Sequence, residues 1–279
     1  MKKICAITMA RNDAFFLSRW IDYYGTQLGN ENLYIFLDGR DQKIPENGGG
    51  ANIKIVEHVE GKLVQSDKGR SSILSKAARE LFENYDLVIG ADVDEFLIVD
   101  PLCKKSLAEY LNEISIKTSV SGLGLDVGQK IGSEVSINPE LPFLSQRSFA
   151  LISSRYTKTS VISQPLSWGA GFHRIRKHNF NIDPNLYLFH FGSADVEIVK
   201  SKMNDTEKIK QGWERHLSKR LKTITLITNK KSLDAEKYLK IARLFQTIFR
   251  PIYAINKPSM CGLKIVIRIP DRFKNKPVI

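Results

Sequence analysis

One apolar run that ends in clustered acids constrains the fold of this chain more than any other feature. Residues 87–97 read LVIGADVDEFL, an aliphatic stretch followed by three carboxylates within four residues. A run without polar alternation is typical of a parallel-sheet strand buried on both faces, and such sheets bind ligands where their strands end. Carboxylates this close repel one another unless a cation neutralises them, so Asp92, Asp94 and Glu95 indicate a site for Mg²⁺ or Mn²⁺. The alternative is that these acids lie in solvent or cap the next element.

Length and cysteine content narrow the class of protein. At 279 residues with 42% hydrophobic content, the chain can bury one large α/β core, with or without an appendage. Cys5, Cys103 and Cys261 are far apart and odd in number, which favours a reducing compartment over a disulfide framework or a zinc site. The first apolar strand is too short for a signal peptide, and no apolar stretch is long enough to span a bilayer. We therefore expect a cytoplasmic protein, soluble or peripheral at the inner face of the membrane.

The net charge of +12 is concentrated near the C-terminus. Residues 201–279 contain 19 Lys and Arg against 6 Asp and Glu, whereas residues 1–200 contain 23 against 24. This asymmetry predicts a near-neutral catalytic domain over residues 1–200 and a basic, mainly helical region over residues 201–279. An excess of positive charge favours an anionic partner, such as acidic lipid headgroups or a polyanionic glycan. Solvated helix faces explain the same charges equally well.

The spacing of apolar residues alternates between helical and strand patterns along the first half of the chain. Helices are predicted at residues 14–28, with Asp13 as the cap, and at residues 71–82 and 107–116. Strands are predicted at residues 4–9, 33–37, 53–59 and 87–91, then in an irregular β-rich part at residues 120–127, 149–153, 159–162 and 186–191. Helices dominate from residue 196 onward. This order predicts an α/β fold with a mixed, mostly parallel sheet flanked by helices.

Two segments resemble known glycosyltransferases. Residues 10–24, ARNDAFFLSRWIDYY, are similar to the opening "RNE, then LxxWIxYH" element of the family 2-like glycosyltransferases and the related family 92 group. Residues 91–96, ADVDEF, are similar to the DxDEF metal motif of these families, and a strand ending in Asp38 lies between the two segments. The resemblance covers residues 4 to about 100 and, more loosely, residues 120–215. It implies the Rossmann-like GT-A fold, with a helical C-terminal extension.

The resemblance implies roles for individual residues. Asp94 would bind Mn²⁺ or Mg²⁺, Asp92 would contact the ribose or a metal-bound water, and His190 would supply a later metal ligand. A lone histidine beside aromatic residues is also often a buried structural group. The residues implied to contact the nucleotide sugar are Ala10, Arg11, Asn12, Asp38, Arg70, Asp92 and His173. Asp38 is equally suited to an Asx turn with Gly39.

An inverting transfer also requires a general base for the acceptor hydroxyl. The carboxylates considered for it are Glu95, Asp126, Glu134 and Asp195. The sequence does not choose among them, and Asp195 is equally placed to cap the helix that begins near residue 196. The resemblance favours inversion, whereas a retaining transfer needs no such base. Arg147 and Lys158 flank predicted strands and are read as surface charges, with acceptor or phosphate contacts as the alternative.

The function that follows is a bacterial, metal-dependent glycosyltransferase of polysaccharide biosynthesis. It would move a sugar from a nucleotide-sugar donor to a hydroxyl of a surface glycan, such as capsule or lipopolysaccharide, either free or lipid-linked. A Mg²⁺-dependent nucleotidyl- or phosphotransferase is the alternative enzyme, although the chain has no P-loop. A non-enzymatic polyanion-binding protein is the other alternative. Aromatic and basic residues of the C-terminal helices fit a peripheral contact with an anionic membrane, packing on the catalytic domain or a homodimer, and no nucleic acid partner is expected.

Overall fold

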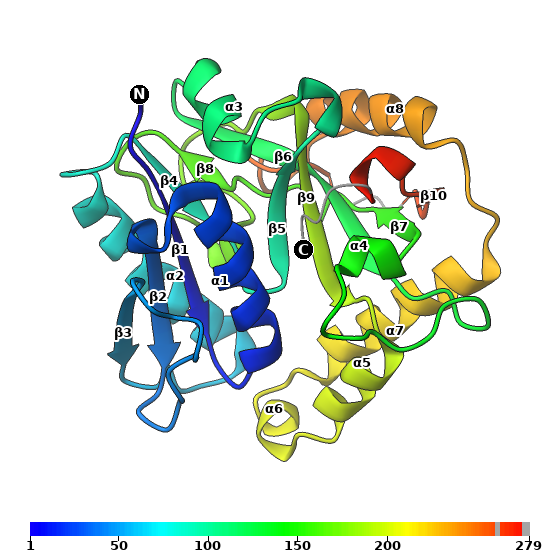
Figure 1. The fold of residues 1–279 in the computed structure, drawn as a ribbon, viewed down its shortest axis with the longest axis horizontal. Helices are drawn as coiled ribbons and strands as arrows, with labels where there is room; N and C mark the ends of the chain where they lie inside the picture. Colours follow the sequence, from blue (N-terminus) through cyan, green and yellow to red (C-terminus); the bar gives the residue numbers. More distant parts are fainter. Residues whose placement is uncertain (260–262, 275–279) are drawn as a thin grey trace.

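The computed structural model describes residues 1–259 and 263–274 and shows a mixed α/β fold (Figure 1). The strands are β1 (Ile4–Ala10), β2 (Leu33–Asp38), β3 (Asn52–Val56), β4 (Leu87–Gly90), β5 (Glu95–Val99), β6 (Ser119–Gly128), β7 (Phe149–Ile152), β8 (Val161–Ile162), β9 (Ile182–Ser193) and β10 (Val266–Arg268). They form one sheet in the order β10-β7-β6-β8-β4-β1-β2-β3, and β9 pairs with both β5 and β6. This mixed sheet, flanked by helices, confirms the predicted fold class.

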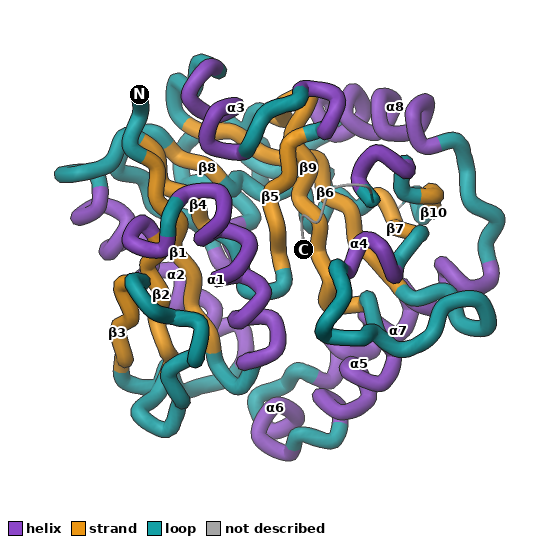
Figure 2. The backbone as a smooth tube through the Cα atoms, viewed as in Figure 1, coloured by secondary structure: helices purple, strands orange, loops and turns teal. Residues whose placement is uncertain are grey.

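Helices flank the sheet and also lie at both of its ends (Figure 2). The α-helices are α1 (Ala14–Leu28), α2 (Leu63–Leu81), α3 (Leu107–Glu113), α4 (Phe143–Gln146), α5 (Val196–Met203), α6 (Thr206–Lys210), α7 (Glu214–Asn229) and α8 (Ala235–Ile248). Short 3₁₀ turns occur at Asn30–Asn32, Pro101–Cys103, Ala170–Phe172 and Asp271–Phe273. No described helix has the length and apolar content that crossing a membrane requires.

The first half of the sheet is parallel, and β1, β2 and β4 are buried on both faces, whereas the edge strand β3 is largely exposed. Strands β3, β2, β1 and β4 lie side by side in parallel register. Successive side chains of a strand point to opposite faces, so Ala6 packs in the same cluster as Trp20 of α1, whereas Ile7 packs with Leu74 of α2. Two helices on opposite faces explain why β1 and β4 are almost continuously apolar. They also explain why the run at residues 87–90 was recognisable as a buried strand.

The second half of the sheet contains a strand that the sequence did not predict. The predicted helix at residues 107–116 is present as α3, but an additional strand, β5, separates it from the acids Asp92 and Asp94. They occupy a turn between β4 and β5, closed by a hydrogen bond from Glu95 N to Asp92 O of 3.0 Å. Strand β5 then pairs antiparallel with β9, and β9 runs parallel to β6. The acidic cluster is therefore held at both ends by strands.

Three smaller expectations also change. Helix α2 begins at Leu63 rather than at residue 71. Asp13 does not cap α1 through its side chain, because its carboxylate accepts a hydrogen bond of 2.7 Å from Lys202 Nζ. Cys5 and Cys103 are free thiols, and Cys261 lies outside the described residues.

The region after residue 200 is built into the same fold. Helix α7 packs against β9, β6 and β7, and β10 extends the sheet by pairing antiparallel with β7. Helix α6 lies beside the carboxyl end of β1, where Lys208 Nζ donates to Asn12 O at 3.3 Å (Figure 1). The basic C-terminal region therefore contributes both a strand and part of the wall around the ends of the parallel strands.

Candidate functional site

Strand register brings together an acid, a histidine and a second acid from distant parts of the sequence. Glu95 of β5 lies opposite His190 of β9, and His190 lies beside Asp126 of β6. Residues paired in this way on adjacent strands point to the same face of a sheet. All three side chains are buried. The site is therefore formed by neighbouring strands whose order no local sequence pattern reveals.

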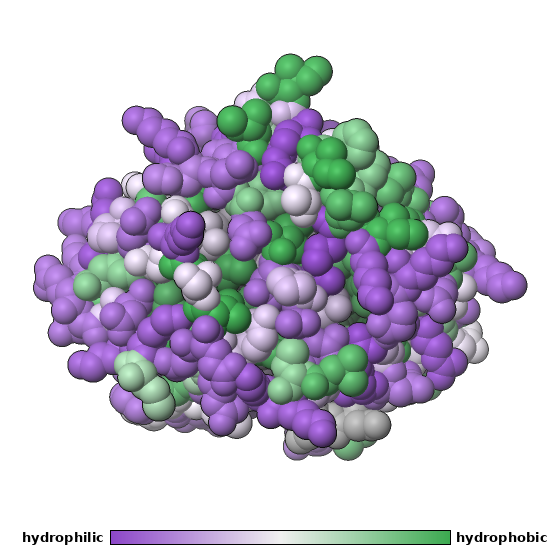
Figure 3. Space-filling model, turned by 90° about the horizontal axis from the view of Figure 1, so that it is seen from above, coloured by the Kyte–Doolittle hydropathy of each residue, from purple (hydrophilic) through white to green (hydrophobic). Residues whose placement is uncertain are grey.

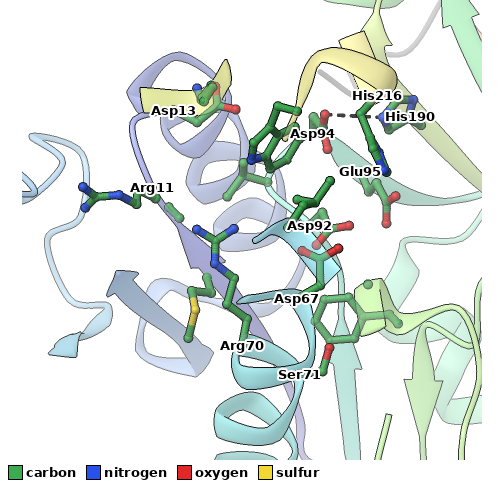
Figure 4. A pocket seen from close by; sticks show the side chains of 18 of the residues that line it. Arg11, Asp13, Asp67, Arg70, Ser71, Asp92, Asp94, Glu95, His190 and His216 are labelled. Carbon is green, nitrogen blue, oxygen red and sulfur yellow. Dashed lines mark ion pairs between the residues drawn. The ribbon is translucent and has the colours of Figure 1, made fainter. Parts of the chain in front are cut away.

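His190 is held by a carboxylate on each side of its ring. Its Nδ1 lies 2.7 Å from Asp126 Oδ1, and its Nε2 lies 3.4 Å from Asp94 Oδ2. The ring stacks on Tyr156 with centroids 3.7 Å apart and an interplanar angle of 14°. Burial alone lowers the pKa of His190, but the charges of Asp94 and Asp126 outweigh it and raise the pKa to about 9. The ring orientation is thus fixed, with Nε2 aimed at Asp94 (Figure 4).

Helix α7 supplies a partner to each of these two carboxylates. Arg220 Nη2 donates to Asp94 Oδ2 at 2.9 Å, and Thr223 Oγ1 donates to Asp126 Oδ2 at 2.9 Å. Burial raises the pKa of Asp94, but the charges of His190 and Arg220 overcome this effect and hold it well below its usual range. Asp94 is therefore a permanent anion at neutral pH.

Lys158 forms ion pairs with the other two acids of the motif. Its Nζ lies 2.7 Å from Asp92 Oδ2 and 2.6 Å from Glu95 Oε1. Burial raises the pKa of Glu95 to about 7 against the opposing charge of Lys158. Burial lowers the pKa of Lys158, but the two carboxylates reverse this and leave it above its ordinary value. The sequence reading of Lys158 as a surface charge is wrong, because its side chain is 3% exposed.

The cluster has the composition of a metal site. Ligand atoms of Asp94, Glu95 and His190 all lie within 4.8 Å of one another. Two carboxylates and an imidazole suit Mn²⁺ and related divalent cations. Glu95 Oε2 is buried and accepts no hydrogen bond among the described residues, which is a costly state for a carboxylate oxygen without a cation. The residues therefore fit a metal, and the structure groups Glu95, rather than Asp92, with Asp94 and His190.

These groups line a cavity with a strongly cationic wall. Asp67 of α2 faces Asp92 across this cavity, and burial together with the charge of Asp92 raises the pKa of Asp67 to about 6 (Figure 4). The basic side chains that line the same cavity are Arg11, Arg70, Arg155, Lys158, Lys202, Lys208 and Arg220. Lys202 and Lys208 come from α5 and α6. A cavity with buried acids on one side and many cations around them suits a phosphorylated ligand.

The residues at the end of β1 lie at one edge of this cavity. Ala10, Arg11 and Asn12 all line it. Arg11 Nη1 donates to Asp38 O at 2.7 Å and to Asp41 Oδ1 at 2.9 Å, so its guanidinium extends away from Asp94 (Figure 4). Asn12 has a left-handed backbone with φ of 50° and is held by hydrogen bonds with Gln42.

Asp38 acts through its neighbours rather than at the cavity wall. It is fully buried, and its carboxylate accepts hydrogen bonds from Arg70 Nε at 2.9 Å and Nη2 at 2.6 Å, as well as from Val59 N at 2.7 Å. His58 Nδ1 lies 3.0 Å from the same carboxylate. Burial raises the pKa of Asp38, but the hydrogen bond from Val59 N–H and the charge of Arg70 outweigh this effect. The pKa of Asp38 therefore lies below its usual value. The side chain therefore orients Arg70, and a contact of Asp38 with a nucleotide stays a prediction.

The four candidates for the general base lie in different surroundings. Glu95 lines the cavity. Asp126 lies behind His190, where His190 and Thr223 engage both of its oxygens. Asp195 caps α5 by accepting from Glu197 N and Ile198 N, which is the alternative that the sequence allowed. Glu134 accepts hydrogen bonds from the backbone of Lys130 and Ser148.

Of the two remaining residues from the sequence analysis, His173 is half-buried and Arg147 is buried. His173 lines the cavity, and burial followed by the charges of Lys158 and Lys257 holds its pKa well below the usual value. Arg147 is fully buried and donates to Ala194 O at 2.5 Å, so its reading as a surface charge is wrong.

Several site residues were not singled out from the sequence. Arg220 and Thr223 are spaced one helical turn apart on α7, but the pattern that would identify them requires knowing which strands α7 covers. Asp67 lies one turn before Arg70 on α2, and this spacing was a usable signal. His216 also lines the cavity, and burial followed by the charge of Lys219 lowers its pKa to about 4.

Comparisons with known proteins give only distant similarities. No family model matches the chain, and no curated protein matches it. A mannose-1-phosphate geranyltransferase from Thermus thermophilus has a TM-score of 0.33 and 11% identity over 95% of this chain and 73% of that one. The bifunctional glycosyltransferase WbbM has a TM-score of 0.27 and 16% identity, covering 45% of this chain and 23% of that one. The galactosyltransferase LgtC, with donor and acceptor sugar analogues, has a TM-score of 0.24 and 20% identity, covering 48% of this chain and 54% of that one. Similarities at this level do not establish a family for the chain.

Proposed function

We propose that the protein is a metal-dependent glycosyltransferase that moves a sugar from a nucleotide-sugar donor to a hydroxyl of a glycan acceptor. The observation that carries this proposal is the meeting of Asp94, Glu95 and His190 at the end of β4, inside a cavity walled by cations. The buried acids suit the cation of a bound metal–diphosphate complex, and the surrounding positive charges suit its phosphate oxygens. The sequence resemblance of residues 10–24 and 91–96 supports the same chemistry.

Each part of the cavity has a role in this proposal. Asp94, Glu95 and His190 would hold Mn²⁺ or Mg²⁺, which would stabilise the negative charge of the departing nucleoside diphosphate. Arg70, aimed by Asp38, presents a planar guanidinium suited to two phosphate oxygens. Lys158 keeps Asp92 and Glu95 in place. Asp126 orients His190, as partners of metal-binding histidines commonly do.

The first experiment separates this function from a nucleotidyltransferase. Purified protein with Mn²⁺ and a panel of nucleotide sugars should release nucleoside diphosphate, whereas a nucleotidyltransferase would release pyrophosphate. Asp94→Ala should abolish both this release and calorimetric binding of Mn²⁺. Asp86→Ala, an exposed acid outside the cavity, is the matched control and should retain both. Full activity of the wild type in EDTA would refute the metal assignment.

A second experiment resolves the role of Glu95. Coordination to a metal cation makes a carboxylate a weaker base, so we expect Glu95 to fill at most one of these roles. If Glu95 is a ligand, Glu95→Gln should weaken Mn²⁺ binding. If it is the base, the variant should bind Mn²⁺ and donor normally but lose transfer to the acceptor. In the second case, the configuration of the product should be inverted, as NMR of the anomeric centre would show.

A further inference from the structure

Helix α8 carries apolar residues on the side that faces solvent. Ile241, Leu244 and Ile248 are 42%, 63% and 61% exposed, and their spacing places them on one helical face. The opposite face packs into the protein through Leu239 and Ala242. Burial against the core explains why the inner face of α8 is apolar. Nothing in the described part of the chain covers the apolar residues of its outer face.

The apolar surface continues beyond the end of α8. Residues 249–259 form a loop closed by a hydrogen bond from Ser259 N to Phe249 O of 3.0 Å. The exposed apolar residues of this surface are Ile241, Leu244, Ile248, Phe249, Ile252, Tyr253, Ile255 and Leu263, which we call the C-terminal apolar face. Figure 3 looks onto the side of the molecule that carries α8 and shows hydrophobic side chains gathered there. A concentration of this kind marks an interaction surface more often than chance exposure.

Cations surround the C-terminal apolar face, and its acids are engaged. The exposed lysines at its border are Lys230, Lys231, Lys237, Lys240 and Lys264. Asp234 caps α8 by accepting from Lys237 N, and Glu236 pairs with Arg272. Lys257 Nζ lies 4.8 Å above the ring of Tyr253. The border therefore presents net positive charge to whatever approaches it.

We propose that the C-terminal apolar face docks on an anionic lipid bilayer, with its apolar side chains in the interfacial layer. Apolar residues bordered by lysines and a tyrosine are the composition of helices that lie in the membrane interface. Lysines beside the inserted residues are attracted to acidic headgroups. A second copy of this chain fits the surface less well, because a symmetric contact would bring two lysine borders together.

The loop of the C-terminal apolar face contacts a segment that leads to the cavity. Asn256 Nδ2 of the loop donates to Ile175 O at 2.7 Å, and Arg250 lies 3.8 Å above the ring of Phe180. His173, which lines the cavity, lies two residues before Ile175. A hollow bounded by Leu151 and Phe245 also reaches Arg155, a residue of the cavity wall. If the proposed function holds, such docking would favour a lipid-linked acceptor, whereas docking itself does not depend on that function.

The test is co-sedimentation of the full-length protein with lipid vesicles. Wild-type protein should bind vesicles of phosphatidylglycerol and phosphatidylcholine, and should bind pure phosphatidylcholine far more weakly. The double variant Leu244→Glu/Ile248→Glu should reduce binding to the mixed vesicles about tenfold or more, because it removes apolar contacts and adds negative charge. Both side chains are exposed, so circular dichroism and nucleotide binding should match the wild type.

The matched control is Ile44→Glu, which introduces the same charge at an apolar residue that is 62% exposed in another part of the molecule. It should bind the mixed vesicles like the wild type. Equal binding by the double variant, or no vesicle binding by the wild type, would overturn the proposal. Light scattering supplies the remaining arm: a dimer that the double variant dissociates, together with no vesicle binding, would assign the face to self-association instead.

Discussion

Gly192 allows His190 and Arg220 to approach the same carboxylate. A Cβ atom at this position would lie 2.6 Å from Arg220 Cζ and 2.6 Å from His190 Nε2, which is too close for real atoms. We predict that Gly192→Ala displaces one of these groups from Asp94 and lowers Mn²⁺-dependent turnover by about 100-fold. The strain should also cost about 1–3 kcal/mol in the free energy of unfolding, measured with urea.

Gly49→Ala is the control for this substitution, since a Cβ there meets no atom within 4 Å. It should leave turnover unchanged. Wild-type turnover in Gly192→Ala would mean that the contact between Asp94 and its two partners does not matter for the reaction.

Asp38 gives a prediction for stability and pH. Its carboxylate is fully buried among Arg70, His58 and Val59 N–H, so Asp38→Asn should cost about 3–5 kcal/mol in unfolding free energy at pH 7. The folded pKa of Asp38 is lowered. Its stabilising contribution is therefore present above the unfolded pKa of about 4 and is lost as pH falls through the folded pKa. The stability difference between variant and wild type should shrink below about pH 4.

Urea unfolding of both proteins between pH 7 and pH 3 provides this measurement. Glu46→Gln, at an exposed acid, should stay within about 0.5 kcal/mol of the wild type at every pH. A constant difference for Asp38→Asn across the range would show that the charge of this carboxylate contributes nothing.

Individual residues differed in how far the sequence revealed them. Asp94 and His190 were singled out because each lies at the end of an apolar run and matches a residue type that the family resemblance implies, and the structure brings them together. In the sequence, Lys158 and Arg220 belong to polar segments that are typical of an exposed surface. Their burial depends on which strands and helices cover them, and that information is long-range.

At the scale of elements, α7 connects the C-terminal region to the site. Thr223 Oγ1 donates to Asp126 Oδ2 at 2.9 Å, and Asp126 in turn orients His190. We predict that Thr223→Val, which keeps the shape but removes the hydroxyl, weakens Mn²⁺ affinity about 10-fold to 100-fold. The loss of one buried hydrogen bond should also lower unfolding free energy by about 1–2 kcal/mol.

Thr225→Val is the matched control on the same helix. Its hydroxyl donates to Leu221 O on the exposed side of α7, so Mn²⁺ affinity should not change. Calorimetric titration of both variants makes the comparison. Equal affinities for Thr223→Val and the wild type would show that the hydrogen bond from Thr223 to Asp126 contributes nothing to metal binding.

The elements themselves were predictable to the extent that their patterns are local. Strand β1, helix α1 and strand β4 follow directly from the spacing of their apolar residues. The two strands are buried on both faces, and the helix is buried on one face, so each leaves a pattern within its own segment. Strand β5 was missed because it follows β4 after only four residues, and its apolar side chains read as a continuation of the same run. The register of β5, β9 and β6, which assembles the site, joins residues 95, 190 and 126. Pairing over such separations leaves no local pattern in the sequence.

At the scale of the molecule, residues 1–200 and 201–279 share one hydrophobic core. The division inferred from charge places Leu239, Ile267, Ile269 and Phe273 in a separate region. In the structure these four side chains are almost fully buried in the cluster that also contains the parallel strands. The charge asymmetry therefore reflects the cationic cavity wall and the border of the C-terminal apolar face, both of which belong to the single fold.

This shared core predicts that residues 1–200 do not fold alone. Removing four fully buried apolar side chains forfeits about 6–12 kcal/mol of burial free energy, which approaches the whole stability of a typical domain of about 5–15 kcal/mol. The truncated chain should show no cooperative urea transition and should bind the dye ANS, whereas a chain ending at Lys274 should unfold cooperatively. A sharp transition for residues 1–200, with native near-ultraviolet circular dichroism, would instead establish an independent N-terminal domain and make the C-terminal region an appendage.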